Sequence, residues 1–352
     1  MTENTINGHR RRPATVEARR LAELARAAGF GDAPDDAIEW SHEAISLLGS
    51  DEETPLLADV LRWQGSVLLH RGLTSRAQPL YERSLRIATT IDYEVGRAHA
   101  LNCLGAMAQR RGDLDGAQQL YRSAASVAER CDEARLCGMV QQNLGILADI
   151  RGQSASALDH YFRSLLTFEQ INDVQMMIWV LNNMGIVHVR DGDLREAEAV
   201  YDRALSMARE RGNLLAEGVI EENRAELRLL QGDLEGAHES ISRALTVAVE
   251  RGDDLRRAAA LRLKGACERH AGDPGAAVNT LQTALTLSAV AEDALLGAEV
   301  LYEFGLALAS TGDETTARTV WNTALDAFER IGARQWIDRV RTRLGDSGRT
   351  AA

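Results

Sequence analysis

A repeat of 40 residues runs through most of this 352-residue chain. With Gly65 as position 0, glycine returns at every fortieth residue up to Gly305, except where Ala225 takes its place. Because no repeat gains or loses a residue, we expect each unit to stack on its neighbours, as in a solenoid protein. The other members of this column are Gly105, Gly145, Gly185 and Gly265.

Each repeat is predicted to form two helices. Apolar residues recur at helical spacing on both sides of a second glycine column at position +7, which runs from Gly72 to Gly312. Glycine adopts the left-handed conformation that ends a helix, and Gly212 and Gly252 are expected to end second helices in the same way. The aspartates that follow the +7 glycine should cap the second helix. They are Asp113, Asp193, Asp233, Asp273 and Asp313.

Two columns of small residues predict close packing between the paired helices. Position 0 is glycine, and position +12 is alanine in seven successive repeats, from Ala77 to Ala317. A glycine inside a helix costs about 1 kcal/mol relative to alanine, so its recurrence indicates a compensating close contact. A large residue at +16 should fill the neighbouring space, and we interpret the four tyrosines there as structural. They are Tyr81, Tyr121, Tyr161 and Tyr201.

The repeat predicts an all-α fold of about eight helical hairpins and one final helix. A degenerate first repeat is centred on Ala25, and the capping helix Gln335–Leu344 ends at Gly345 with an arginine-rich face expected in solvent. Residues 14–345 are predicted to form a single superhelix, with disordered segments at 1–13 and 346–352.

Composition excludes several classes of function. The formal charge of −12 and the pI of about 5.3 argue against nucleic-acid binding. No apolar run reaches the roughly 18 residues of a membrane span, and the polar N-terminus lacks a secretory signal, so we expect a cytoplasmic protein. Four scattered cysteines and eight histidines form no ligand pattern, and no catalytic motif occurs. We therefore expect a non-enzymatic protein without metal or cofactor.

The residues around Gly185 carry a resemblance to a known family. The pattern is Leu-Gly, then alanine, then an aromatic residue four positions after the alanine. Leu104-Gly105 begins it in one repeat. In the repeat around Gly185, methionine stands in place of the leucine, and Ala197 and Tyr201 follow at the expected positions. This pattern resembles the tetratricopeptide signature. The 40-residue period is similar to that of kinesin light chains and LGN-type adaptors, and to the sensor regions of MalT-type activators. The resemblance implies a right-handed α-solenoid, although the usual aromatic at position +3 is absent.

In this family the first helix of each hairpin lines the concave face. The resemblance therefore implies exposure of positions −6, −3, −2, +1, +4 and +5. Asparagine fills position −2 in three successive repeats, as Asn143, Asn183 and Asn223. A side-chain amide both donates and accepts, so this ladder is suited to hold the backbone of an extended peptide. The alternative is that these amides are solvated or bond to a neighbouring repeat.

Further candidates for peptide binding surround the ladder. The apolar residues suit hydrophobic anchors of a peptide, although packing between repeats is the alternative for about half of the apolar strip. The candidates are Asn102, Asn182, Met139, Ile146, Trp179, Ile186, Arg110 and Arg190.

The function predicted is a scaffold that binds a peptide or an extended segment of a partner protein in the groove. A small-molecule sensor is the second reading, although the inner aromatic residues Trp63, Trp179 and Tyr302 are far apart in sequence. A third reading is self-association, either through a second copy or through the chain's own basic arm, residues 10–12.

Overall fold

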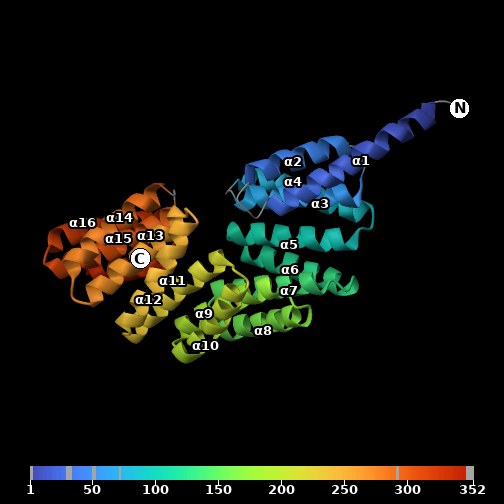
Figure 1. The fold of residues 1–352 in the computed structure, drawn as a ribbon. Coiled ribbons are helices and arrows are strands. Elements are labelled where there is room, and N and C mark those ends of the chain that lie inside the picture. The colour runs from blue at the N-terminus through green and yellow to red at the C-terminus, as the bar shows by residue number, and fades with distance from the viewer. Residues whose placement is uncertain (1–2, 29–33, 50–52, 71–72, 291–292, 346–352) are drawn as a thin grey trace, which may run out of the picture. The chain divides into compact units, whose positions relative to one another are not determined.

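The computed structural model describes residues 3–28, 34–49, 53–70, 73–290 and 293–345. These residues form 17 helices and no strand (Figure 1). The predicted all-α fold of helical hairpins followed by a lone capping helix is confirmed. The chain divides into two compact units, residues 1–176 and 177–352, each of which is described by itself.

The first unit contains four helical hairpins and the start of a fifth. The paired helices pack against each other, and successive first helices α1, α3, α5 and α7 are also in contact. The helices are α1 (Glu3–Ala28), α2 (Pro34–Leu48), α3 (Pro55–His70), α4 (Thr74–Thr90), α5 (Glu94–Arg110), α6 (Leu114–Arg130), α7 (Ala134–Ile150) and α8 (Ser154–Gln170).

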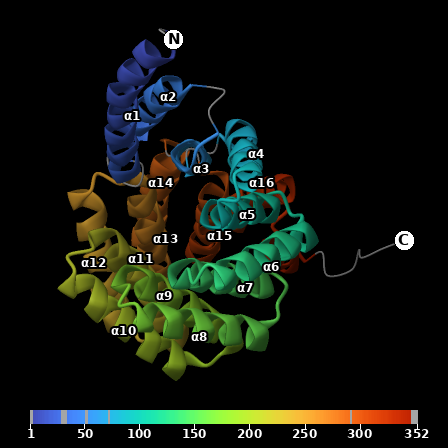
Figure 2. The ribbon, with the colours of Figure 1, turned by 90° about the vertical axis from the view of Figure 1, so that its right-hand side faces the viewer.

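The second unit contains the remaining hairpins and the capping helix. Helix α13 contacts α11 on one side and α15 on the other, as Figure 2 shows. The helices are α9 (Val174–Asp191), which begins just before the boundary, α10 (Leu194–Glu210), α11 (Leu214–Gln231), α12 (Leu234–Glu250), α13 (Asp254–His270), α14 (Pro274–Val290), α15 (Ala294–Thr311), α16 (Glu314–Ile331) and α17 (Arg334–Leu344).

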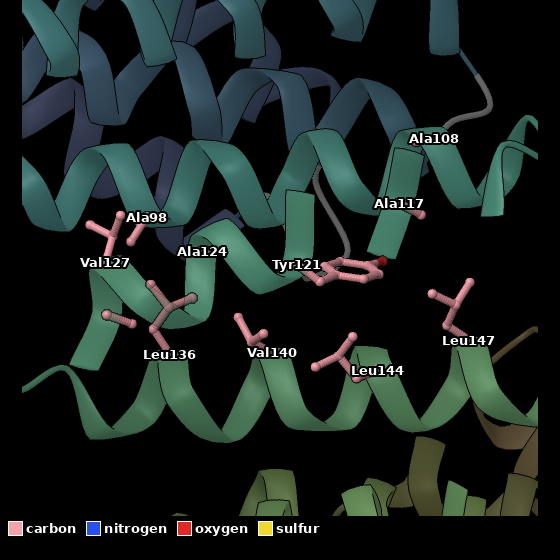
Figure 3. Packing of buried hydrophobic residues seen from close by; sticks show 11 residues of the cluster. Ala98, Ala108, Ala117, Tyr121, Ala124, Val127, Leu136, Val140, Leu144 and Leu147 are labelled. Atoms are coloured by element: carbon pink, nitrogen blue, oxygen red, sulfur yellow. The ribbon is translucent and has the colours of Figure 1, made fainter. Parts of the chain in front are cut away.

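The close approach predicted between position 0 and position +16 is present. A Cβ atom added to Gly105 would lie 2.6 Å from the Tyr121 ring, and one added to Gly145 would lie 2.6 Å from the Tyr161 ring. The tyrosine ring therefore occupies the space that any larger residue at position 0 would need. In the core shown in Figure 3, Tyr121 of α6 lies above the apolar row of α7, which includes Leu144.

The predicted turn chemistry is confirmed with one exception. The +7 glycines from Gly112 onward are left-handed, with φ of 80° at Gly112 and 92° at Gly312, and Gly72 lies outside the described residues. Asp113 caps α6 by accepting from the Gly116 amide over 2.9 Å, and Asp233, Asp273 and Asp313 cap in the same way. The prediction for Asp193 is wrong, because its side chain makes no capping bond. Its carboxylate instead lies 3.7 Å from Nδ1 of His188.

The end of the second helix is also left-handed, as predicted for Gly212 and Gly252 with φ of 62° and 63°. In the first unit this position holds Asp92, Asp132 and Asn172, with φ between 54° and 56°. Aspartate and asparagine tolerate this conformation better than other non-glycine residues. The turn is therefore kept where the glycine is missing.

One helix boundary differs from the sequence prediction. Helix α1 begins at Glu3, whereas we expected a disordered arm over residues 1–13. Gly8 and Pro13 lie inside this helix and have low helix propensity, so local preference did not predict it. The single superhelix expected over residues 14–345 stays a prediction. The predicted tail, residues 346–352, lies outside the described residues.

The prediction that no segment is long and apolar enough to cross a membrane missed α15. Its 18 residues have a mean hydropathy of 1.3, which meets that requirement by length and composition alone. The apolar surface has a packing role, because Ala298, Val300 and Ala307 are buried against neighbouring helices. Glu299 and Glu303 interrupt the apolar sequence.

Candidate functional site

A cavity of about 870 Å³ lies in the second unit. Its walls come from the first helices of successive hairpins and from the capping helix. On α9 to α15, the lining residues of these first helices occupy positions −3, −2, +1, +4 and +5, all of which the resemblance implies to be exposed. The lining residues are Ile186, Val189 and Arg190 of α9; Tyr201 of α10; Asn223, Glu226, Leu229 and Leu230 of α11; Arg262, Leu263, Ala266, Arg269 and His270 of α13; Tyr302 and Glu303 of α15; and Gln335, Trp336 and Arg339 of α17.

The wall formed by α9 and α11 carries exposed apolar side chains beside the polar residues Arg190, Asn223 and Glu226. Ile186 is 41% exposed and Leu230 is 60% exposed, although both belong to helices that bury other apolar residues. Val189 and Leu229 extend the same wall. Exposed aliphatic side chains lining a cavity provide anchor points for an apolar group of a ligand.

The wall formed by α13 and α15 carries paired charges. Arg262 Nε lies 3.4 Å from Glu299 Oε2, and Arg269 Nη2 lies 3.4 Å from Glu303 Oε2. Arg269 Nη2 is also 3.2 Å from His270 Nε2.

Aromatic residues close the end of the cavity beside α17. The Tyr302 and Trp336 rings meet edge to face with centroids 5.4 Å apart, and the Arg339 guanidinium lies 4.8 Å from the Trp336 ring centroid. Sequence reasoning missed Trp336, and it assigned Arg339 to a solvent-facing cap. The sequence feature that could have indicated this contact is the position of Trp336 in the first turn of a helix predicted to cover the last hairpin.

The asparagines predicted to bind peptide lie in both units, and four of them bond to one another in pairs. Asn143 Nδ2 donates to Asn102 Oδ1 over 2.8 Å in the first unit. Asn223 Nδ2 donates to Asn182 Oδ1 over 2.7 Å in the second. The asparagine at position −2 of one repeat thus bonds to the asparagine at position −3 of the repeat before it. This agrees with the alternative that these amides bond to a neighbouring repeat. Asn183 is half-buried on α9, and only Asn223 of these five lines the cavity.

The other predicted residues are distributed over both units. Ile186 and Arg190 line the cavity, whereas Trp179 is half-buried on α9 outside it. In the first unit, Met139 and Ile146 are half-buried on α7. Arg110 Nη1 donates to the carbonyl oxygen of Leu69 over 3.3 Å, so that arginine joins two helices of the unit.

Two carboxylates near the cavity have raised pKa values. Burial raises the pKa of Glu222 to about 7, although Arg256 Nη1 lies 3.0 Å from its Oε2. The other oxygen, Oε1, is buried without a hydrogen-bond partner among the described residues, which explains why burial outweighs the ion pair. Burial also raises the pKa of Glu299 against the opposing effect of Arg262.

Among the described residues, no group of three or more histidine, cysteine, aspartate or glutamate side chains could hold a metal ion. The cavity combines exposed aliphatic groups, an aromatic pair and several arginines. Such a surface is suited to recognising an amphipathic ligand by contact.

Stacked hairpins of constant length define an α-helical repeat protein. Residues 96–170 and 176–248 match the family model of the tetratricopeptide repeat. These two segments are therefore tetratricopeptide repeats, as the sequence predicted. No curated protein sequence matches it.

Solved structures share the fold at low sequence identity. Aspartyl phosphate phosphatase F from Bacillus subtilis matches with a TM-score of 0.65 at 11% identity, over 82% of this chain and 75% of that one. The Rap conjugation gene regulator of plasmid pLS20, in complex with the Phr* peptide, matches with a TM-score of 0.63 at 14% identity, over 87% of this chain and 85% of that one. A Rap protein complexed with competence and sporulation factor matches with a TM-score of 0.61 at 13% identity, over 96% of this chain and 97% of that one.

Proposed function

We propose that the chain is a non-enzymatic scaffold that binds an extended peptide segment of a partner protein in the cavity of its second unit. The observation that carries the proposal is the cavity itself, which successive first helices line with side chains exposed to a ligand. An extended segment matches a surface to which each repeat adds one row of residues. A cytoplasmic location belongs to the same proposal.

Three further points support a peptide ligand. Ile186 and Leu230 offer two aliphatic anchors on neighbouring helices. Asn223 bonds to Asn182 through one N–H, and an amide has a second N–H and a carbonyl oxygen for other partners. One protein that shares the fold, the pLS20 regulator, was solved in complex with a peptide.

The test uses the full chain immobilised on a surface and a random pool of seven-residue peptides. Peptides retained after washing are eluted and sequenced by mass spectrometry. We expect the wild-type chain to retain a defined subset, because anchors and arginines at fixed positions select particular sequences. Retention of no peptide above the level of a blank surface would refute the proposal.

A pair of variants locates the binding site. Leu230→Asp places a charge in the apolar wall and should abolish retention of the selected peptides. Val249→Asp is the matched control, because Val249 is 62% exposed on α12 and does not line the cavity. Equal retention by both variants would show that peptides bind elsewhere.

A small-molecule sensor is the second candidate, and the contact between Tyr302 and Trp336 favours it. The sequence suggested that the inner aromatic residues were too scattered for a stacking site, but the capping helix brings Trp336 against Tyr302. A panel of sugars and nucleotides in a thermal-shift assay tests this reading. A shift of the unfolding temperature that Trp336→Phe reduces would support the sensor.

A further inference from the structure

We infer that the capping helix α17 selects the ligand, and that Arg339 on its Trp336 platform binds an acidic residue of the peptide. This inference rests on the proposed function and adds the chemistry of the ligand. It replaces the interpretation of α17 as a cap that only shields the last hairpin from water.

The capping helix is firmly attached to the second unit. Trp336 stacks on Phe328 with ring centroids 5.3 Å apart and planes 3° from parallel. Val340 and Leu344 are buried, and Arg318 Nη2 donates to the carbonyl oxygen of Leu344 over 3.1 Å. A side chain presented by α17 therefore has a fixed origin before any ligand binds, which reduces the entropy lost on binding.

Arg339 is the cation of the cavity that is best placed to take a new partner. Arg262 and Arg269 already have carboxylate partners, Glu299 and Glu303. Arg339 makes no direct ion pair with any residue that the structure describes, and its guanidinium group stacks over Trp336. Stacking orients the planar group and leaves its N–H donors free to bind a carboxylate.

The charge of the lining supports an acidic ligand. Four arginines and two glutamates line the cavity, and Glu299 and Asp191 pair with two of these arginines, Arg262 and Arg190. Among the described residues, Arg339 is thus the lining arginine that has no carboxylate at ion-pair distance. A peptide with an aspartate or glutamate is complementary to it.

The positions of the groups also give the peptide a direction. The exposed aliphatic residues Ile186 and Leu230 belong to α9 and α11, whereas Arg339 belongs to α17, at the other end of this series of helices. Glu226, an exposed carboxylate, also belongs to α11. We infer that the apolar residue of the ligand lies toward α9 and α11 and the acidic residue toward α17.

The experiment compares the peptides that three forms of the full chain retain from the random seven-residue pool. The wild type should enrich peptides that contain both an aliphatic and an acidic residue. Arg339→Glu should lose the acidic enrichment, and it should bind a selected acidic peptide about tenfold more weakly. Arg343→Glu is the matched control, because it makes the same charge change on an exposed position of α17 outside the cavity.

The outcomes separate this inference from the proposed function. Retention of peptides without acidic enrichment would refute the role of Arg339 but leave peptide binding intact. The same acidic enrichment by Arg339→Glu as by the wild type would also refute it. Retention of no peptide by the wild type would refute both. Circular dichroism of each variant confirms that the exposed substitutions leave the helices folded.

Discussion

Asn223 of α11 donates a hydrogen bond from Nδ2 to Oδ1 of Asn182 on α9, over 2.7 Å. Asn143 and Asn102 form the same pair in the first unit, over 2.8 Å. The accepting residues are buried, with 5% exposure for Asn182 and 6% for Asn102. The asparagine column is thus a means of joining one repeat to the next, and it also presents one amide, Asn223, to the cavity.

A double-mutant cycle should reveal this link. Asn223→Ala leaves the Asn182 carbonyl oxygen buried without its partner, and we expect it to lower the free energy of unfolding by about 1–2 kcal/mol. Asn182→Ala should cost a similar amount. The double variant should cost less than the sum, with a coupling of about 1 kcal/mol. Urea unfolding measures all four forms, and additive losses would show that the bond does not stabilise the stack.

Gly185 is predicted to be essential for the packing of its hairpin. A Cβ atom at this position would overlap the ring of Tyr201, which is 1% exposed and cannot move away. Overpacking of a core costs about 1–3 kcal/mol, against a gain of about 1 kcal/mol from the better helix propensity of alanine. Gly185→Ala should therefore destabilise the chain in urea unfolding. A more stable variant would contradict the role assigned to this glycine.

Gly297 on α15 should respond in the opposite direction. A Cβ atom there would lie 3.7 Å from Ser288 Oγ, an ordinary contact, and the residue borders a hollow of about 330 Å³. Gly297→Ala should stabilise the chain by about 1 kcal/mol because it removes a helix-breaking residue without strain. The two substitutions are chemically identical, so their opposite signs in the same urea assay would separate packing from helix propensity.

The repeat could be predicted from the sequence because its determinants are local and repeat at constant spacing. Gly112 ends a helix, Asp113 caps the next, and Gly105 accommodates Tyr121. Each of these contacts lies within one repeat. The agreement of seven repeats in the same columns makes the hairpin the only arrangement that satisfies them all.

The candidate site could be predicted only in part because it depends on contacts between repeats. The inner positions of Ile186, Arg190 and Asn223 follow from the family resemblance. The meeting of Trp336 with Tyr302 does not, because α17 lies outside the repeating columns and its face toward the last hairpin is set by packing. Bonding of the asparagines to a neighbouring repeat was one of the alternatives, but their partners could not be identified because each pair joins different columns of successive repeats.

Glu222 predicts how stability depends on pH. Its pKa is raised by burial from an ordinary value of 4.5 to about 7. The folded chain therefore keeps a proton that the unfolded chain has lost, and its contribution to stability falls as the pH rises through 7. Glu222→Gln removes this effect. Between about pH 6 and about pH 8, the free energy of unfolding of the variant should rise relative to the wild type by about 1–2 kcal/mol.

Glu217 on the same helix provides the matched control. Its pKa is lowered, chiefly by the hydrogen bond from Arg243 Nε at 2.7 Å, so its carboxylate is ionised in both folded and unfolded chains over this pH range. Glu217→Gln should lower stability by a constant amount between about pH 6 and about pH 8, because the lost ion pairs do not titrate there. Urea unfolding of the three forms at several pH values measures both effects. A pH-independent difference between Glu222→Gln and the wild type would show that Glu222 is ionised in the folded chain, held in that state by Arg256.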